Sequence, residues 1–162
     1  MFGKLVESEL LGETKKEMVI FNQLHETETY MKYREAFNFA KKHQRGDPFN
    51  PKRFFPKSIR DALKNEEALS IEDESQLGFY TALNSPLDRY HGVDAFIEYR
   101  NGEKTVVVTI DVTMNSSKDR YKADVILAIP SGGLDPNDEN YSDYINQYVK
   151  QIQEKILTKS SN

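Results

Sequence analysis

The stretch VDAFIEYRNGEKTVVVTIDVT, residues 93–113, decides the fold of this chain. Two runs rich in β-branched and aromatic residues, 93–99 and 105–113, flank the dipeptide Asn101-Gly102. That dipeptide between two such runs is typical of a β-hairpin with a tight type I′ turn. The stretch therefore predicts two antiparallel strands joined by a two-residue loop.

Two aspartates fall on one side of the predicted hairpin. With a loop at 101–102, Arg100 faces Glu103, and in the same register Asp94 and Asp111 are diagonal neighbours. Carboxylates held this close repel each other, and a bound divalent cation relieves the repulsion. The structural alternative is that Asp94 caps the start of its strand while Asp111 accepts hydrogen bonds from loop amides.

The segments around the hairpin predict the rest of an α/β fold. Residues 77–83 form a first strand, and the apolar run 123–129 predicts a strand buried on both faces in the middle of the sheet. Residues 141–157 carry apolar side chains at helical intervals and predict an amphipathic helix that covers one face. We therefore expect a mixed central β-sheet of about four strands flanked by helices.

The N-terminal part is predicted to be helical. Residues 4–43 contain helix-forming residues and predict one long or broken helix, followed by a Pro-containing loop at 45–56 and a short helix at 59–69. The expected organisation is an N-terminal helical extension with a basic, Pro-rich loop (1–57) on an α/β core (58–162). The two parts form one compact unit.

The amino-acid composition excludes several kinds of functional site. The 162 residues include no cysteine, which excludes disulfides, zinc–thiolate sites and a thiol nucleophile. A metal would be held by oxygen ligands, which favours magnesium or manganese. The sequence also shows no apolar run long enough for a membrane span, so we expect a soluble, cytoplasmic protein that makes no membrane contact.

Positive charge is concentrated in residues 32–60, which hold nine basic residues against two acidic ones, although the net charge of the chain is -4. Phenylalanines alternate with these bases, a composition typical of surfaces that contact phosphates and stack on bases. The alternative is that the phenylalanines anchor a core while the bases face water. The predicted nucleic-acid-binding residues, with DNA favoured over RNA, are Lys41, Lys42, Arg45, Lys52, Arg53, Lys57 and Arg60.

The order of these features resembles the core of the PD-(D/E)XK nuclease superfamily. The resemblance covers residues 58–157 and rests on Gly-Val-Asp at 92–94, the hairpin with TVVVTIDVT at 105–113, a further buried strand and a helix. It implies a restriction-endonuclease-like fold that hydrolyses phosphodiester bonds. In that family two acids chelate magnesium, and Asp94 and Asp111 match them.

The resemblance also bears on the remaining site residues. The resemblance implies that the carbonyl of Val112 is a third metal ligand. Thr113 occupies the position where the family has a lysine that activates water. Lys118 and Lys122 are the candidates to replace that lysine. A glutamate near the metals is common in the family, and the eligible residues are Glu13, Glu17, Glu66 and Glu67.

Three functions stay open. The first is a magnesium- or manganese-dependent nuclease, either an endonuclease or an exonuclease. The second, favoured by the missing lysine, is a nuclease-like accessory protein without catalysis that binds nucleic acid or protein, of viral or mobile-element origin. The third is a structural interaction protein whose N-terminal helices pack on a partner, with a homodimer as a possible assembly.

Overall fold

The structure, a computed structural model, describes residues 2–14, 30–114 and 122–161, with the side chains described from residue 6 onward. It contains five described α-helices, two short 3₁₀ helices and four strands. In chain order they are α1 (Phe2–Leu11), α3 (Tyr33–Lys42), α4 (Phe54–Lys64), η1 (Glu67–Leu69), η2 (Glu74–Gln76), β1 (Leu77–Thr81), α5 (Pro86–His91), β2 (Ala95–Asn101), β3 (Lys104–Thr113), β4 (Val125–Ala128) and α6 (Tyr141–Ser160).

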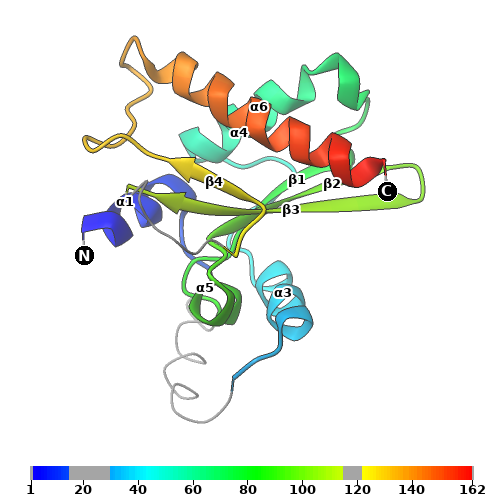
Figure 1. The fold of residues 1–162 in the computed structure, drawn as a ribbon, viewed down its shortest axis with the longest axis horizontal. Coiled ribbons are helices and arrows are strands. Elements are labelled where there is room, and N and C mark those ends of the chain that lie inside the picture. The colour runs from blue at the N-terminus through cyan, green and yellow to red at the C-terminus, as the bar shows by residue number, and fades with distance from the viewer. Residues whose placement is uncertain (1, 15–29, 115–121, 162) are drawn as a thin grey trace.

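The strands form one mixed sheet with the order β1-β2-β3-β4. The first three strands are antiparallel neighbours, and β4 runs parallel to β3. Figure 1 shows α4 and α6 on one face of the sheet, α3 and α5 on the other, and α1 beside the end of the sheet near the N-terminus. The expected α/β architecture with a four-stranded mixed sheet flanked by helices is confirmed.

Each face of the sheet has its own core. Alternation along the strands sends Phe79, Ile97 and Val108 towards α4 and α6, whereas Tyr80 and Phe96 point towards α3 and α5. The first core is the larger, and Leu10 and Leu11 of α1 belong to it. The N-terminal helices are thus part of the packed unit on both faces of the sheet.

The predicted hairpin is present with a different register. Asn101 pairs with Lys104, so Gly102 and Glu103 form the loop instead of Asn101-Gly102. Gly102 adopts a φ of +63° whereas Glu103 keeps a negative φ, the pattern of a type II′ turn with glycine first. The shift amounts to two residues, so every side chain keeps its predicted face.

The prediction that the apolar run 123–129 lies in the middle of the sheet is wrong. Its strand, β4, is only four residues long and pairs with β3 alone, so it is an edge strand. Val125 and Leu127 are buried under α6, but Ile126 is half-buried and Ala128 is exposed on the other face. The apolar composition follows from packing under α6 and does not require a second neighbouring strand.

The predicted bounds of the N-terminal elements need correction. The helix expected over 4–43 is broken into α1 and α3, and part of the segment lies outside the described residues. Helix α4 begins at Phe54, five residues before the predicted start of 59. Pro56 is tolerated in the first turn because N–H groups there have no partner within the helix. The division expected between 57 and 58 therefore falls inside α4.

The C-terminal helix is confirmed and is longer than expected. Helix α6 runs to Ser160 and buries five side chains on one face: Ile145, Tyr148, Val149, Ile152 and Ile156. Helix α5, which was not expected, starts with proline and ends at Gly92 in a left-handed conformation. Among the helices that the structure describes, none combines the length and the apolar content needed to cross a membrane.

Candidate functional site

Asp94 immediately precedes β2, at the end of the hairpin away from its turn. The ladder between β2 and β3 ends with the pair Ala95–Ile110, and Asp94 lies one residue beyond it. Two backbone hydrogen bonds hold Asp94 between the neighbouring strands: its N–H donates to Ile110 O at 2.9 Å, and its carbonyl accepts from Ala82 N–H at 2.8 Å. Asp94 and Asp111 are thus at the same end of the hairpin.

The two carboxyl groups meet in a buried place. Asp94 is 5% exposed and Asp111 is 7% exposed, and their side chains share a hydrogen bond. Oδ2 of Asp94 accepts from the backbone N–H of Val112 at 2.8 Å. This bond agrees with the structural alternative, in which Asp94 caps the start of its strand. Asp94 therefore has a structural contact in addition to its contact with Asp111.

Burial raises the pKa of Asp94 far above its ordinary value, and the hydrogen bond with Asp111 raises it further. The negative charges of Asp88 on α5 and Glu7 on α1 act in the same direction, and the Val112 N–H opposes them. This raised pKa means that the ionised form of Asp94 is disfavoured until a cation is present. The sequence reasoning missed both Asp88 and Glu7, because only packing of α5 and α1 brings them near Asp94.

The glutamates and lysines considered from the sequence lie elsewhere or are not described. Glu66 and Glu67 adjoin η1, whose Leu69 carbonyl accepts the Tyr99 hydroxyl towards the turn of the hairpin. Glu13 accepts a hydrogen bond from Ser8 at 3.1 Å. Glu17 and Lys118 lie outside the described residues.

Lys122 does not enter the sheet beside the aspartates. Ile126 is the residue of β4 that pairs with Asp111, and Lys122 precedes it by four positions. Asp124, two residues after Lys122, bonds the Thr109 N–H at 2.9 Å, further towards the hairpin turn. Thr113 is 8% exposed, and its carbonyl accepts from Ile129 N–H at 2.8 Å.

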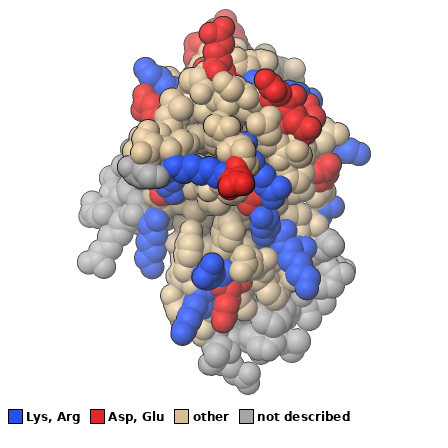
Figure 2. Space-filling model, turned by 90° about the vertical axis from the view of Figure 1, so that its right-hand side faces the viewer, with Lys and Arg blue, Asp and Glu red and all other residues tan. Residues whose placement is uncertain are grey.

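The basic residues predicted to bind nucleic acid do not form one surface. Arg60 is 4% exposed and is used inside the protein, where it bonds the Leu77 carbonyl at 2.8 Å and pairs with Glu74. Lys41 on α3 pairs with the buried Glu98 at 2.6 Å. Lys42 and Lys57 are exposed on α3 and α4, in different layers of the molecule. Figure 2 shows basic side chains across the middle and lower half of one face, with acidic side chains interspersed.

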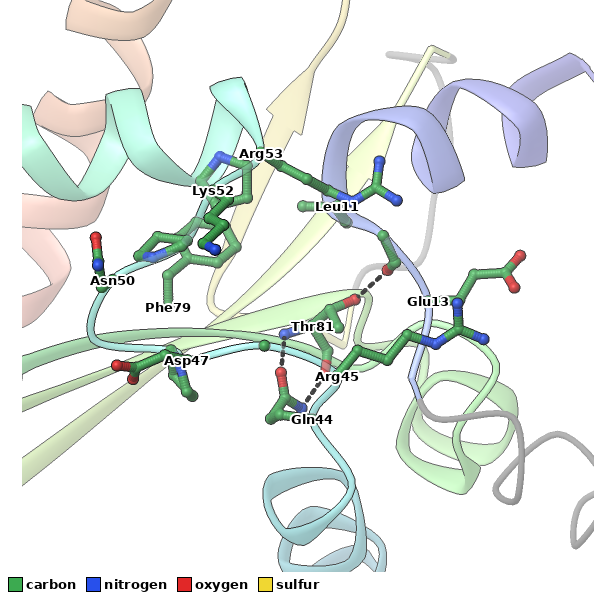
Figure 3. Close-up of a pocket in the computed structure, with 15 residues that line it drawn as sticks. Leu11, Glu13, Gln44, Arg45, Asp47, Asn50, Lys52, Arg53, Phe79 and Thr81 are labelled. Carbon is green, nitrogen blue, oxygen red and sulfur yellow. Dashed lines mark hydrogen bonds between the residues drawn. The ribbon is translucent and has the colours of Figure 1, made fainter.

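Three of the predicted basic residues do come together. Arg45, Lys52 and Arg53 line a cavity of about 480 Å³ at the β1 edge of the sheet, next to the end of α1 and the start of α4 (Figure 3). Phe79 and Thr81 of β1 line the same cavity. The basic segment thus contributes a pocket rather than a continuous patch.

The phenylalanines of the basic segment are packed. Phe55 is fully buried in the larger core, and Phe37 lies against Phe96 with ring centroids 4.5 Å apart. Phe49 contacts Tyr80 edge to face at 6.3 Å, and Phe54 contacts Tyr141 at 6.0 Å. This arrangement agrees with the alternative in which the phenylalanines anchor the core. The basic side chains, and not the phenylalanines, are therefore what the segment offers to a ligand.

Comparisons with known proteins give no further identification. No family model matches the sequence, and neither the curated proteins nor the solved structures include a significant match. Assignment of function therefore depends on the chemistry of the two sites described above.

Proposed function

We propose that this chain is a metal-dependent nuclease that hydrolyses phosphodiester bonds at Asp94 and Asp111, with DNA favoured over RNA and the cytoplasm as its location. The observation that carries the proposal is the buried contact between the two carboxyl groups at the end of β2 and β3. Two acids pressed together in this way are costly unless they share a proton or bind a cation. The proposal is consistent with the resemblance to the PD-(D/E)XK superfamily.

The donor atoms at the site fit magnesium or manganese. Both side chains supply carboxylate oxygens, and the Val112 carbonyl faces the same side of β3 as the Val112 N–H that bonds Asp94. No group of three or more His, Asp or Glu side chains forms a metal site among the described residues. Magnesium is often held by one or two carboxylates, with waters and substrate phosphates as its other ligands, so two carboxylates suffice.

When bound, such a metal lowers the pKa of a bound water and stabilises charge on the scissile phosphate. In this scheme Asp94 and Asp111 hold the ion, and the Val112 N–H keeps the Asp94 carboxylate in place. Asp88 and Glu7 add negative potential that attracts the cation. Lys118, which lies outside the described residues, stays the proposed group for orienting the attacking water, whereas Lys122 precedes β4 on the side of the hairpin turn.

The test uses isothermal titration of magnesium and manganese together with cleavage assays on duplex and single-stranded DNA and RNA. Asp94→Asn keeps an oxygen for the Val112 N–H while removing the charge, and Asp111→Asn removes the second carboxylate. We expect each variant to lose metal binding and to lower cleavage by more than about 100-fold, beyond the effect of most outer-shell changes. Asp143→Asn, an exposed position in the first turn of α6, is the matched control. Retained metal binding in both site variants contradicts the proposal.

A second candidate function is a nuclease-like binding module without catalysis. It is favoured by Thr113, which replaces the family lysine, and by the hydrogen bond that gives Asp94 a structural contact. The same assays, together with titration of the four oligonucleotides into the protein, separate the two functions. A protein that binds oligonucleotide but neither binds metal nor cleaves any of the four substrates is the binding module.

A further inference from the structure

The cavity at the β1 edge is a preformed pocket. The Gln44 side chain pairs with the Thr81 backbone in both directions, donating to the carbonyl at 2.8 Å and accepting from the N–H at 3.1 Å. Phe79 N–H donates to the Pro48 carbonyl at 2.9 Å, and the Thr81 hydroxyl donates to the Gly12 carbonyl at 2.6 Å. Three separate segments of the chain are thereby locked around the cavity before any ligand enters.

The positive charges of the pocket are oriented by the same framework. Arg45 Nε donates to the Thr14 carbonyl at 2.9 Å, and Arg53 Nη1 donates to the Glu9 carbonyl at 3.1 Å. These bonds use one N–H of each guanidinium and fix its direction, which leaves further donors for an anion. Lys52 adds a third cation, and Figure 3 shows its side chain beside Phe79 on the wall of the pocket.

Two acids also line the pocket, but both are engaged at its rim. Asp47 Oδ1 accepts from the Phe49 N–H at 2.9 Å, and Glu13 accepts from the Ser8 hydroxyl. In Figure 3 their carboxylates lie at opposite sides of the pocket and point outward. The pocket lining thus carries three cations against two acids.

The start of α4 strengthens this polarity. Its N-cap residue is Arg53, whose side chain does not accept a hydrogen bond from the first turn. The N–H groups of that turn and the helix dipole add positive potential beside the three cations. Apolar side chains, which include Leu11, Pro48, Pro51 and Phe79, line the same pocket between these cations. A volume of about 480 Å³ is in the range of pockets for small molecules, about 300–1,000 Å³.

We propose that this pocket binds the terminal phosphate monoester of a nucleotide, with the phosphate on Arg45, Lys52 and Arg53 and the nucleoside against the apolar side chains around Phe79. The nucleotide is either free or the end of a nucleic-acid strand. The binding step requires no metal and stands apart from the chemistry at Asp94.

The pocket is connected to Asp94 through β1. Thr81, which lines the pocket, pairs with Ala95, and the next residue of β1, Ala82, bonds the Asp94 carbonyl. Strand β2 lies between β1 and β3, so the pocket at the β1 edge is two strands away from Asp111.

The test measures binding in EDTA at fixed ionic strength, so that loss of cleavage cannot be confused with loss of binding. The probes are AMP, adenosine, and a fluorescent single-stranded DNA 10-mer with a 5′-phosphate or a 5′-hydroxyl. We expect AMP and the phosphorylated 10-mer to bind at least about tenfold more tightly than their unphosphorylated forms. Comparable affinity of AMP and the phosphorylated 10-mer identifies a free nucleotide as the ligand, whereas tighter binding of the 10-mer identifies a strand end.

Two variants address the pocket directly. Lys52→Gln removes a cation, and Gly46→Asp adds a carboxylate at a lining position where a Cβ would meet nothing within 4 Å. We expect each to weaken binding of the phosphorylated probes by at least about fivefold. The matched controls are Lys57→Gln, an exposed lysine outside the pocket, and Gly132→Asp, an equally open glycine. Equal affinity for phosphorylated and unphosphorylated probes, or equal losses in the controls, overturns the proposal.

Discussion

At the scale of single residues, the molecule holds two carboxyl groups in contact at one end of its hairpin. Asp94 and Asp111 are both nearly buried, and one N–H, that of Val112, supports the Asp94 carboxylate. Burial disfavours the ionised form of Asp94, and its hydrogen bond with Asp111 acts in the same direction. The pair therefore costs stability in the metal-free protein, and this cost gives the protein a measurable pH dependence.

The first prediction concerns that pH dependence. Because the folded protein raises the pKa of Asp94, folding retains a proton that the unfolded chain loses above about pH 4. The stability contributed by this proton is fully present below the unfolded pKa and is lost as pH rises towards and through the raised pKa. In EDTA, we expect the free energy of unfolding to fall between pH 5 and pH 8, with a slope of up to about 1.4 kcal/mol per pH unit.

Urea denaturation at several pH values measures this slope, and Asp94→Asn is the comparison. The amide cannot ionise, so the variant should show a much shallower decline over the same interval. Magnesium should restore stability to the wild type at pH 8, because binding to the folded state stabilises it. Parallel pH profiles for the two proteins count against the assignment of the raised pKa to Asp94.

A second residue-scale prediction concerns Ser85, which precedes α5. Its hydroxyl is buried and has no hydrogen-bond partner among the described residues, and it does not cap the helix. Ser85→Ala should therefore leave the free energy of unfolding unchanged or raise it by up to about 1 kcal/mol. Thr14→Val is the contrast, since the Thr14 hydroxyl donates to the Leu83 carbonyl at 2.9 Å, and its loss should cost about 1 kcal/mol. Thermal or urea unfolding that shows Ser85→Ala to be the more damaging change contradicts this reading.

At the scale of elements, the end of α1 and the start of α4 depend on each other. Gly12 ends α1 with a φ of +73°, and a Cβ there would lie 2.4 Å from Arg53 Nε. The side chain of Arg53 can cross the end of α1 only because residue 12 has no side chain. A glycine thus sets both the end of a helix and the position of a pocket cation.

We predict that Gly12→Ala lowers the free energy of unfolding by about 1–2 kcal/mol, since alanine is strained at positive φ and also displaces Arg53. Gly46→Ala is the matched control, because its Cβ meets nothing within 4 Å and its φ is not positive. That change should be neutral or slightly stabilising, by up to about 1 kcal/mol. Urea unfolding of both variants checks the prediction, which fails if the two behave alike.

At the scale of the whole molecule, one sheet carries two cores. Leu10, Leu11 and Phe55 pack with α6 on one face, while Ala36 and Ala40 of α3 close the other. Each face of the sheet thus receives side chains from the N-terminal third of the chain. The sheet cannot bury both faces without these helices.

It follows that a fragment of residues 58–162 should not fold. The fragment lacks α1, α3 and the first turn of α4, including the fully buried Phe55. We expect the full chain to unfold in one cooperative transition and the fragment to show none, because large parts of both cores become exposed. Thermal unfolding followed by circular dichroism makes the comparison. A cooperative transition in the fragment would show that the core is independent of the N-terminal helices.

Elements with a strong local pattern could be predicted from the sequence. The hairpin at 93–113 follows from two β-rich runs and a glycine turn, and the shift of its register by two residues kept the predicted faces. Helix α6 follows from the helical spacing of its buried side chains. The meeting of Asp94 with Asp111 was predictable for the same reason, since it depends only on the pairing within one hairpin.

The sequence by itself thus determined the hairpin, its two aspartates, the C-terminal helix and the concentration of positive charge in residues 32–60. Tertiary structure alone decided that β4 is an edge strand, that Glu7 and Asp88 act on Asp94, and that Arg45, Lys52 and Arg53 share a pocket while Arg60 is buried. The physical reason is the separation along the chain of the residues that interact. Strand pairing across a short turn is set by neighbours in sequence, whereas the approach of α1, α4 and α5 to the sheet depends on how separate apolar faces pack together.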